Sequence, residues 1–164
     1  RCPLQKLCTM TPTTTIDAMD RSAREQVEFG VLYAGIQQFY AHQMQLFDAF
    51  RAEQWAATFT EEAVFDVPTL PEPVRGRTAL AACVRHNEDV ARRTGERLRH
   101  WLGMLDVEQR PDGTVRTRAY ALVYMTPPDG VPKVHRVCVM EDTLVRSRGR
   151  WRTAHRLVSR DDLS

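Results

Sequence analysis

Two residues of types that move protons, His100 and Asp48, stand where the sequence places apolar side chains. Alternate residues of a strand share a face, so His100 is expected beside Leu102 and Met104. Asp48 follows Met44 by one helical turn, at the margin of an apolar helix stripe. An imidazole can take and return a proton near neutral pH, and a carboxylate on its other nitrogen fixes its tautomer. Such a pair suffices for proton abstraction beside a carbonyl and for expulsion of a β-hydroxyl as water, with no cofactor.

Residue types alone leave a second interpretation open. His100 could be a core histidine satisfied by backbone groups, and Asp48 a surface acid at a helix end. Other chemistries lack a pattern: the cysteines form no CxxC pair, no Cys/His spacing is typical of zinc, and Ser22 and Ser159 lack a nucleophile motif. We therefore expect neither a metal nor a cofactor.

The first half of the chain is predicted to be helical. Residues 23–50 contain no proline, and apolar residues recur at steps of three and four, which predicts one long helix. The apolar residues of this stripe are Leu32, Ile36, Phe39, Tyr40, Met44, Phe47 and Phe50. A short helix is expected at 53–59. A third helix is expected at 78–94, with Gly95 as its stop signal.

The second half is predicted to be an antiparallel meander. Turn sequences separate β-rich runs with no helical pattern between them. The expected strands are 62–67, 96–109, 114–125, 133–146 and 150–159. Helices followed by strands indicate an α+β domain, which we expect to be one curved antiparallel sheet with helix 23–50 across its concave side.

Composition limits the possible functions. A length of 164 residues suits a single domain, placed here at 23–164. Residues 1–22 are predicted to be a disordered leader or an added segment, with 1–9, which hold Cys2 and Cys8, excluded from the fold. The net charge of +2, from 23 basic and 21 acidic residues, argues against a nucleic-acid partner. No apolar run is long enough for a membrane span and no signal peptide is visible, so we expect a cytoplasmic protein.

Two long runs carry a family resemblance. RHWLGMLDVEQRPDGTVRTRAYALVY at 99–124 and VCVMEDTLVRSRGRWRTAHRLVSRD at 137–161 resemble the second half of a SnoaL-like domain. LFDAFRAEQWAATFTEEAVFDVP at 46–68 resembles its first half. The resemblance covers roughly residues 25–160 and implies a cystatin-like cone, a curved sheet covered by N-terminal helices around a pocket. Within this superfamily of scytalone dehydratases, polyketide cyclases and dioxygenase small subunits, the runs are most similar to actinorhodin-type proteins of aromatic polyketide pathways.

The resemblance also implies roles for the two titratable residues. In scytalone dehydratase-like proteins a histidine at this strand position and an aspartate at this helix position face each other, which makes His100 the general acid/base and Asp48 its partner. The chain departs from the dehydratase pattern elsewhere. It has Phe47 before the aspartate and Val67 in the short strand, where the family has tyrosines, and Val123 to Met125 where a second histidine would lie.

Substrate contacts are expected from the inward faces of the helix and strands. The expected substrate-binding residues are Tyr40, Met44, Phe47, Phe65, Leu102, Met104, Val123, Met125, Cys138, Met140 and Arg156. These side chains could equally be ordinary core. Asp142 and Arg156 could form an inward ion pair at the pocket mouth, and a surface pair or no pair is an equal alternative.

The opposite face of the sheet is expected to mediate assembly. Tyr120, Leu122 and Tyr124 alternate with the proposed pocket residues, and with Val137 and Val139 they would form a large apolar patch. This predicts a homo-oligomer, with a homodimer favoured over a homotrimer.

Three functions follow. The first is a cofactor-free cyclase, dehydratase or isomerase, that is a lyase or isomerase, acting on a small aromatic polyketide-type ketone. The second is the non-catalytic small subunit of a ring-hydroxylating dioxygenase-like complex. The third is a non-catalytic protein that binds a polyketide while it cyclises spontaneously. The presence of both Asp48 and His100 favours the enzyme over the subunit.

Overall fold

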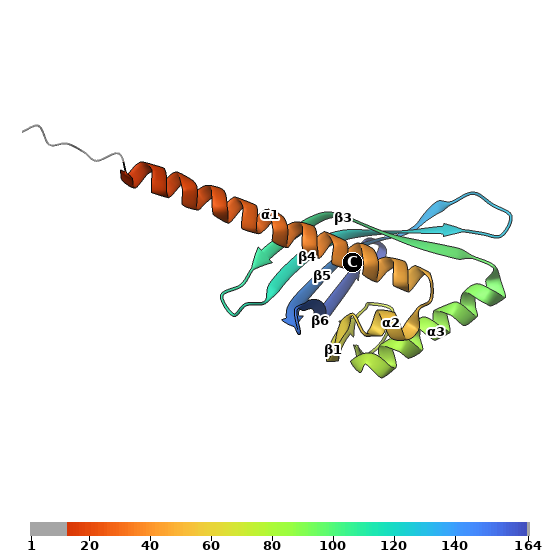
Figure 1. Cartoon of the computed structure of the whole chain (residues 1–164). Coiled ribbons are helices and arrows are strands. Elements are labelled where there is room, and N and C mark those ends of the chain that lie inside the picture. The colour runs from red at the N-terminus through yellow and green to blue at the C-terminus, as the bar shows by residue number, and fades with distance from the viewer. Residues whose placement is uncertain (1–12, 164) are drawn as a thin grey trace, which may run out of the picture. The chain divides into compact units, whose positions relative to one another are not determined.

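The computed structural model describes residues 13–163, and these fall into two units, which are described separately. The first unit ends at Gly35 and contains the beginning of helix α1, Thr13–Asp48 (Figure 1). The helix starts ten residues before the predicted position 23. The reason is that no proline or glycine interrupts the chain between Thr13 and Phe29. The predicted leader residues 1–9 lie outside the described residues.

The second unit begins at Ile36 and holds the rest of α1, two further helices and the described strands (Figure 1). The helices are α2, Ala52–Ala56, and α3, Gly76–Thr94. The strands are β1 Phe59–Asp66, β2 Val74–Arg75, β3 Arg97–Gln109, β4 Val115–Thr126, β5 Lys133–Ser147 and β6 Arg150–Arg160, and a 3-10 turn covers Asp161–Leu163. The α+β class and the four long strands are confirmed, whereas β2 was not predicted.

The sheet has the order β2-β1-β6-β5-β4-β3, and one pairing differs from the prediction. Three hairpin-linked pairs, β3–β4, β4–β5 and β5–β6, are antiparallel. In contrast, β1 pairs with β6 in parallel, with Phe65 opposite Arg156. The expectation of a wholly antiparallel sheet is therefore wrong at this pair. These two strands are linked through α3 and the whole meander, and so long a connection does not impose the antiparallel direction of a hairpin.

A β-bulge in β3 corrects one predicted site residue. The β3–β4 register shifts between Gly103 and Asp106, and Met104 adopts a left-handed backbone with φ 50°. A bulge adds a residue to one strand and so reverses which face its later residues occupy. Met104 is consequently 79% exposed and lies on the outer face, not beside His100 as predicted. Bulges of this kind also bend the strands, and register shifts recur in the β4–β5, β5–β6 and β1–β6 pairs.

The second part of α1 is fastened to the inner face of the sheet by a buried polar network. Arg156 donates from Nε and Nη2 to the Asp142 carboxylate over 2.8 and 2.6 Å, and its Nη2 also donates to Gln43 Oε1 over 2.6 Å. Tyr40 Oη donates to Asp142 Oδ2 over 2.9 Å and lies 2.5 Å from Thr117 Oγ1. The Asp142–Arg156 pair is thus present, but it is fully buried instead of bracing a pocket mouth.

We predict that Arg156→Met strongly destabilises the fold. The variant leaves the Asp142 carboxylate buried without its cation, a change that typically costs about 3–5 kcal/mol. Urea unfolding should show a much lower midpoint. Arg160→Met, four residues along β6, removes an exposed partner of Asp162 and serves as the matched control. Equal midpoints for the two variants would contradict the importance of the buried pair.

Candidate functional site

The structure brings Asp48 and His100 into direct contact. His100 Nδ1 lies 2.6 Å from Asp48 Oδ1, and the backbone N–H of His100 donates to Asp48 Oδ2 over 3.1 Å. The Asp48 side chain is 11% exposed and the His100 side chain 19%, so water reaches the pair only in part. Both carboxylate oxygens are therefore held by a single residue of β3, which fixes the imidazole relative to the end of α1.

The end of α1 places the carboxylate at this point. Asp48 is the last residue of the helix, and the chain then turns through Phe50, whose φ is 55°. The turn is closed by backbone bonds from Phe50 N to Phe47 O and from Arg51 N to Leu46 O. A carboxylate is electrostatically disfavoured at a helix C-terminus. The two donors of His100 supply the compensating contacts.

The His100 ring leaves one nitrogen available. An ionised carboxylate only accepts hydrogen bonds, so Nδ1 carries the hydrogen in the neutral ring and Nε2 carries the lone pair. Phe47 contacts the ring edge-on, with centroids 5.0 Å apart, and restricts its rotation. Nε2 makes no hydrogen bond within residues 13–163. The arrangement is therefore that of an oriented base with a free acceptor nitrogen.

Most of the other predicted contact residues lie on the same inner face. Val123 stands opposite His100 in the β3–β4 pair, and Cys138 and Met140 stand opposite Ala121 and Ala119 in the β4–β5 pair. The predicted residues of this face that are buried or half-buried are Met44, Phe47, Phe65, Leu102, Val123, Met125, Cys138 and Met140. This face beside the dyad is apolar, with small residues at its centre.

Two predicted contacts, Tyr40 and Arg156, are occupied by internal partners. Each is no more than 3% exposed and belongs to the Asp142 network. Gln43 was not among the predicted residues. Its Nε2 donates to Thr58 Oγ1 over 2.8 Å, and its Oε1 accepts from Arg156. The available signal was a polar residue between Tyr40 and Met44 within an apolar helix stripe.

The sequence and the fold are similar to those of a known protein family. A SnoaL-like domain profile matches residues 32–157. The chain belongs to the SnoaL-like domain family. The resemblance inferred from the strand sequences is confirmed. No curated protein is significantly similar in sequence.

Three similar solved structures come from Streptomyces and Catenulispora species. Aln2 from a Streptomyces species is 39% identical over 80% of this chain and 92% of its own, with a TM-score of 0.72. ActVI-ORFA from Streptomyces coelicolor is 33% identical over 80% and 98%, with a TM-score of 0.71. A protein from Catenulispora acidiphila, solved in complex with S-DNPA, is 36% identical over 82% and 96%, with a TM-score of 0.71.

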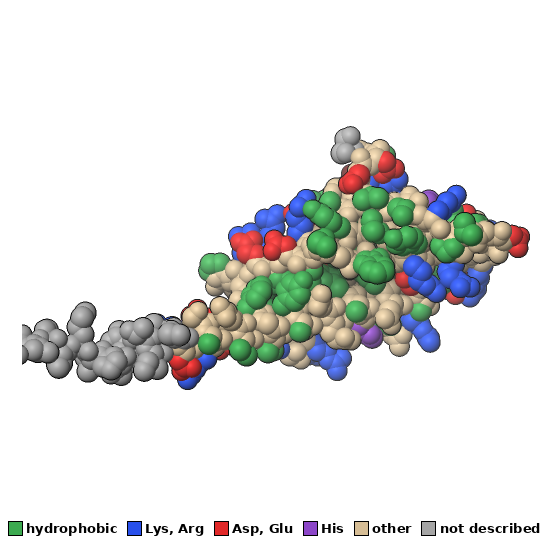
Figure 2. Space-filling model, turned by 90° about the horizontal axis from the view of Figure 1, so that it is seen from above, with side chains coloured by type: hydrophobic (Ala, Val, Ile, Leu, Met, Phe, Trp, Pro, Cys, Tyr) green, Lys and Arg blue, Asp and Glu red, His purple; other side chains and the backbone are tan. Residues whose placement is uncertain are grey.

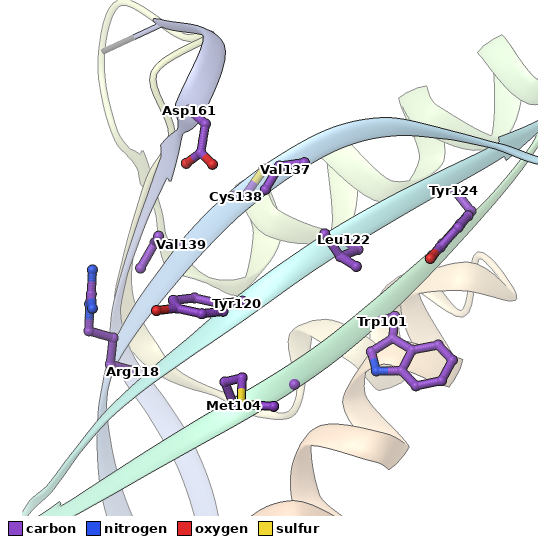
Figure 3. Close-up of a pocket in the computed structure, with 11 residues that line it drawn as sticks. Trp101, Met104, Arg118, Tyr120, Leu122, Tyr124, Val137, Cys138, Val139 and Asp161 are labelled. Carbon is purple, nitrogen blue, oxygen red and sulfur yellow. The ribbon is translucent and has the colours of Figure 1, made fainter.

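Beyond the dyad, this SnoaL-like domain carries a groove on its outer sheet face. The groove has a volume of about 660 Å³, and Figure 3 shows its side chains on neighbouring strands β3, β4 and β5, together with Asp161 from the 3-10 turn. Its lining residues are Trp101, Gly103, Met104, Arg118, Tyr120, Leu122, Tyr124, Val137, Cys138, Val139 and Asp161. Trp101 is 66% exposed and Tyr120 49%. Figure 2 shows hydrophobic side chains gathered on one face of the molecule.

Between residues 13 and 163, no three His, Cys, Asp or Glu side chains are grouped so as to hold a metal ion. No described helix is long and apolar enough to cross a bilayer.

The polar network perturbs the ionisation of its members. Burial, reinforced by the charge of Asp142, raises the pKa of Tyr40 well above its usual value. Burial lowers the pKa of Arg156, but the Asp142 carboxylate outweighs this effect and the net pKa is raised. Tyr40 is therefore a neutral donor and Arg156 a permanent cation.

We predict that Tyr40 makes the domain lose stability in alkali. Its pKa is higher in the folded state than the value of about 10 in the unfolded chain. Its contribution is therefore complete below about pH 10 and is lost as the pH rises towards the folded-state pKa. Unfolding free energies can be measured with urea between about pH 9 and pH 11, one unit either side of the ordinary tyrosine pKa. They should fall less steeply with pH for Tyr40→Phe than for wild type.

Tyr124→Phe is the control, because it leaves the network intact. Burial also raises the pKa values of Cys83 and Cys138, but both cysteines remain in every variant and cancel in the comparison. Identical slopes for wild type and Tyr40→Phe would contradict the prediction.

Proposed function

We propose that this SnoaL-like domain is a cofactor-free enzyme that cyclises, dehydrates or isomerises an aromatic polyketide-type ketone. The observation that carries the proposal is the 2.6 Å contact between His100 Nδ1 and Asp48 Oδ1, with Nε2 left free. This is the arrangement that general acid–base catalysis requires of an imidazole. A cytoplasmic location remains our expectation for such an enzyme.

The proposed chemistry needs only the dyad. His100 Nε2 takes a proton from the carbon beside the substrate carbonyl, and the electron pair of the broken C–H bond moves into an enolate. The Asp48 carboxylate stabilises the imidazolium that results. In a dehydration the enolate then expels the β-hydroxyl, which leaves as water with the proton from His100. In an isomerisation the same proton returns to another carbon of the enolate. In a cyclisation the enolate carbon bonds to a second carbonyl carbon of the substrate, and the alkoxide formed from the broken C=O π bond takes the proton, so the protein ends unchanged.

The proposed substrate class rests on the apolar inner face and on the relatives. Val123 and Met125 offer no charge, which suits a flat and weakly polar ring system. The relative from Catenulispora acidiphila was solved with S-DNPA, and we propose that this chain binds a ligand of the same class.

One observation favours the alternative of a binding protein without catalysis. Val123 and Met125 supply no second titratable side chain beside the dyad, and Tyr40 is held by Asp142 and Thr117. A chain that only shelters a reactive polyketide would need no such group. Measuring binding and proton transfer separately distinguishes the two functions.

We predict that His100→Ala lowers the catalytic rate at least about a hundredfold, within the range of about 10² to 10⁴ expected for general acid–base assistance. The assay follows water loss from aromatic β-hydroxy ketones, together with deuterium incorporation beside the carbonyl in D₂O. Asp48→Asn should lose less, because an amide can still hold the ring, although it permits the wrong tautomer.

The exposed His86 on α3 provides the control variant, His86→Ala, which should keep wild-type rates. Circular dichroism should show all three variants folded. A wild-type protein that binds S-DNPA but neither dehydrates ketones nor exchanges protons would refute the enzyme and leave the binding protein.

We further propose that the domain forms a homodimer through its outer groove. Trp101, Met104 and Tyr120 stand exposed on one face, and contiguous apolar patches of this kind are rare on monomers. A two-fold dimer would place the same patch of both copies in contact, with about 800 Å² per partner in an interface of standard size. A second copy is thus the proposed occupant, and a trimer is the alternative outcome.

We predict that light scattering gives about twice the 18.8 kDa chain mass at micromolar concentration. Trp101→Glu should convert this species to monomer, because it buries a charge at the centre of the interface. Val131→Glu is the matched control, since Val131 is 80% exposed but lies in the β4–β5 turn outside the groove. A wild-type monomer, or dimers of both variants, would refute the outer-face dimer.

A further inference from the structure

Trp55 carries a buried polar atom that the fold leaves without a partner. Its side chain is 2% exposed, and its indole Nε1–H is buried with no hydrogen-bond acceptor among the described residues. Buried donors in native proteins are nearly always paired, so an exception calls for an explanation such as a ligand. Trp55 lies on α2, and the proposed reaction gives it no role.

The rings around Trp55 connect it to the dyad. Phe47 packs against the indole at a centroid distance of 4.8 Å and against the His100 imidazole at 5.0 Å. The Phe47 ring therefore contacts both the indole that carries the unpaired N–H and the imidazole of the dyad. The other ring neighbours of Trp55 are Phe59 at 4.7 Å and Phe65 at 6.1 Å, and neither supplies a conventional acceptor.

No side chain in this aromatic cluster can satisfy the donor from within. Thr58 Oγ1, the nearest hydroxyl in sequence, is occupied: it donates to the backbone carbonyl of Trp55 over 2.6 Å and accepts from Gln43. The Asp142 carboxylate already accepts from Arg156 and Tyr40, and the Arg156 guanidinium can only donate. The indole N–H thus remains unpaired within the described residues and is available to an acceptor from outside the protein.

We propose that the Trp55 Nε1–H is a substrate-binding donor, which hydrogen-bonds a carbonyl or hydroxyl oxygen of the ligand on which His100 acts. This inference rests on the proposed function, and it adds a polar contact to the apolar residues beside the dyad. A fused aromatic ligand carries oxygens on rings other than the reacting one. Donation from Trp55 to such an oxygen would select oxygenated polycyclic ketones over plain aromatic ones and would fix their orientation towards His100.

The proposed hydrogen bond from Trp55 should contribute more to ligand affinity than a bond from an exposed donor. The indole N–H has no hydrogen-bond partner among the described residues, so a ligand oxygen would form a bond with it without breaking one within the protein. Removing the N–H should therefore cost more affinity than removing an ordinary exposed donor. We expect at least about a tenfold rise in the S-DNPA dissociation constant for Trp55→Phe, measured by calorimetry.

The control is Trp151→Phe, which removes an indole from the β5–β6 hairpin, where it contacts Arg146. Its dissociation constant should stay within about twofold of wild type, well inside the tenfold that one hydrogen bond can contribute. Because Trp55→Phe also leaves space in the core, a second measurement reads the wild-type bond directly. The chain has three tryptophans, so ¹⁵N-labelled protein gives three indole signals, assigned by substituting Trp101 and Trp151. The Trp55 indole proton should move downfield on saturation with S-DNPA.

The outcomes separate this inference from the proposed function. A Trp55 proton that stays in place at saturation, or Trp55→Phe binding as tightly as wild type, overturns the role of Trp55 alone. If the Trp55 proton shifts downfield in both wild type and His100→Ala while the wild-type protein catalyses no reaction, the role of Trp55 is supported and only the enzyme proposal is refuted. Failure of the wild-type protein to bind S-DNPA overturns the ligand class and the Trp55 assignment together.

Discussion

The buried pair of Asp142 and Arg156 is the interaction on which the rest of the domain depends. Two charges can remain in an apolar interior only if nearly every donor and acceptor around them is paired. Here the Asp142 carboxylate accepts from both Arg156 and Tyr40, and Arg156 reaches Gln43 as well. The network thus joins strands β5 and β6 to the second part of α1. Replacing one member with an apolar residue would leave buried polar groups of the others unpaired, so the stability of each member depends on the rest.

This network also determines where the catalytic candidate lies. Gln43 and Asp48 are five residues apart on α1, so fixing the amide of one limits the position of the other. The carboxylate of Asp48 then meets β3 at His100, whose ring is held from the side by Phe47. A polar contact at the centre of the sheet and a polar contact at its edge strand are therefore mechanically linked through one helix.

Strand β4 shows how one sequence serves two surfaces. Its residues alternate between buried, such as Ala119 and Val123, and partly exposed, such as Tyr120 and Tyr124. Inward residues such as Ala119 and Val123 are small and apolar, whereas the large aromatic residues on the outer side line the groove. The alternation of period two was readable from the sequence, and it gave both faces of this strand correctly. The same reasoning failed for Met104, because a bulge depends on the register of two strands and leaves no fixed mark in one of them.

Other differences between sequence and structure have the same origin in tertiary contacts. The long strands, the helix of the apolar stripe and the contact of Asp48 with His100 were predicted, since periodicity, turn residues and the family resemblance are all local in the sequence. The parallel pairing of β1 with β6 was not, because it joins segments that are distant in the chain. Gln43 was overlooked for a related reason. A buried amide is stable only through partners such as Arg156 and Thr58, and only the fold brings these together.

The position of Asp48 at the end of α1 affects the electrostatic surroundings of the dyad. At the last residue of α1 its carboxylate stands in the negative field of the helix C-terminus, a place that favours cations over anions. When the ring is neutral, the carboxylate is held there by the Nδ1–H and the backbone N–H of His100. When the ring accepts a proton at Nε2, the new positive charge meets both the carboxylate and the helix end. The carboxylate and the helix end thus lie on the Nδ1 side of the ring, opposite the Nε2 atom that would face the substrate.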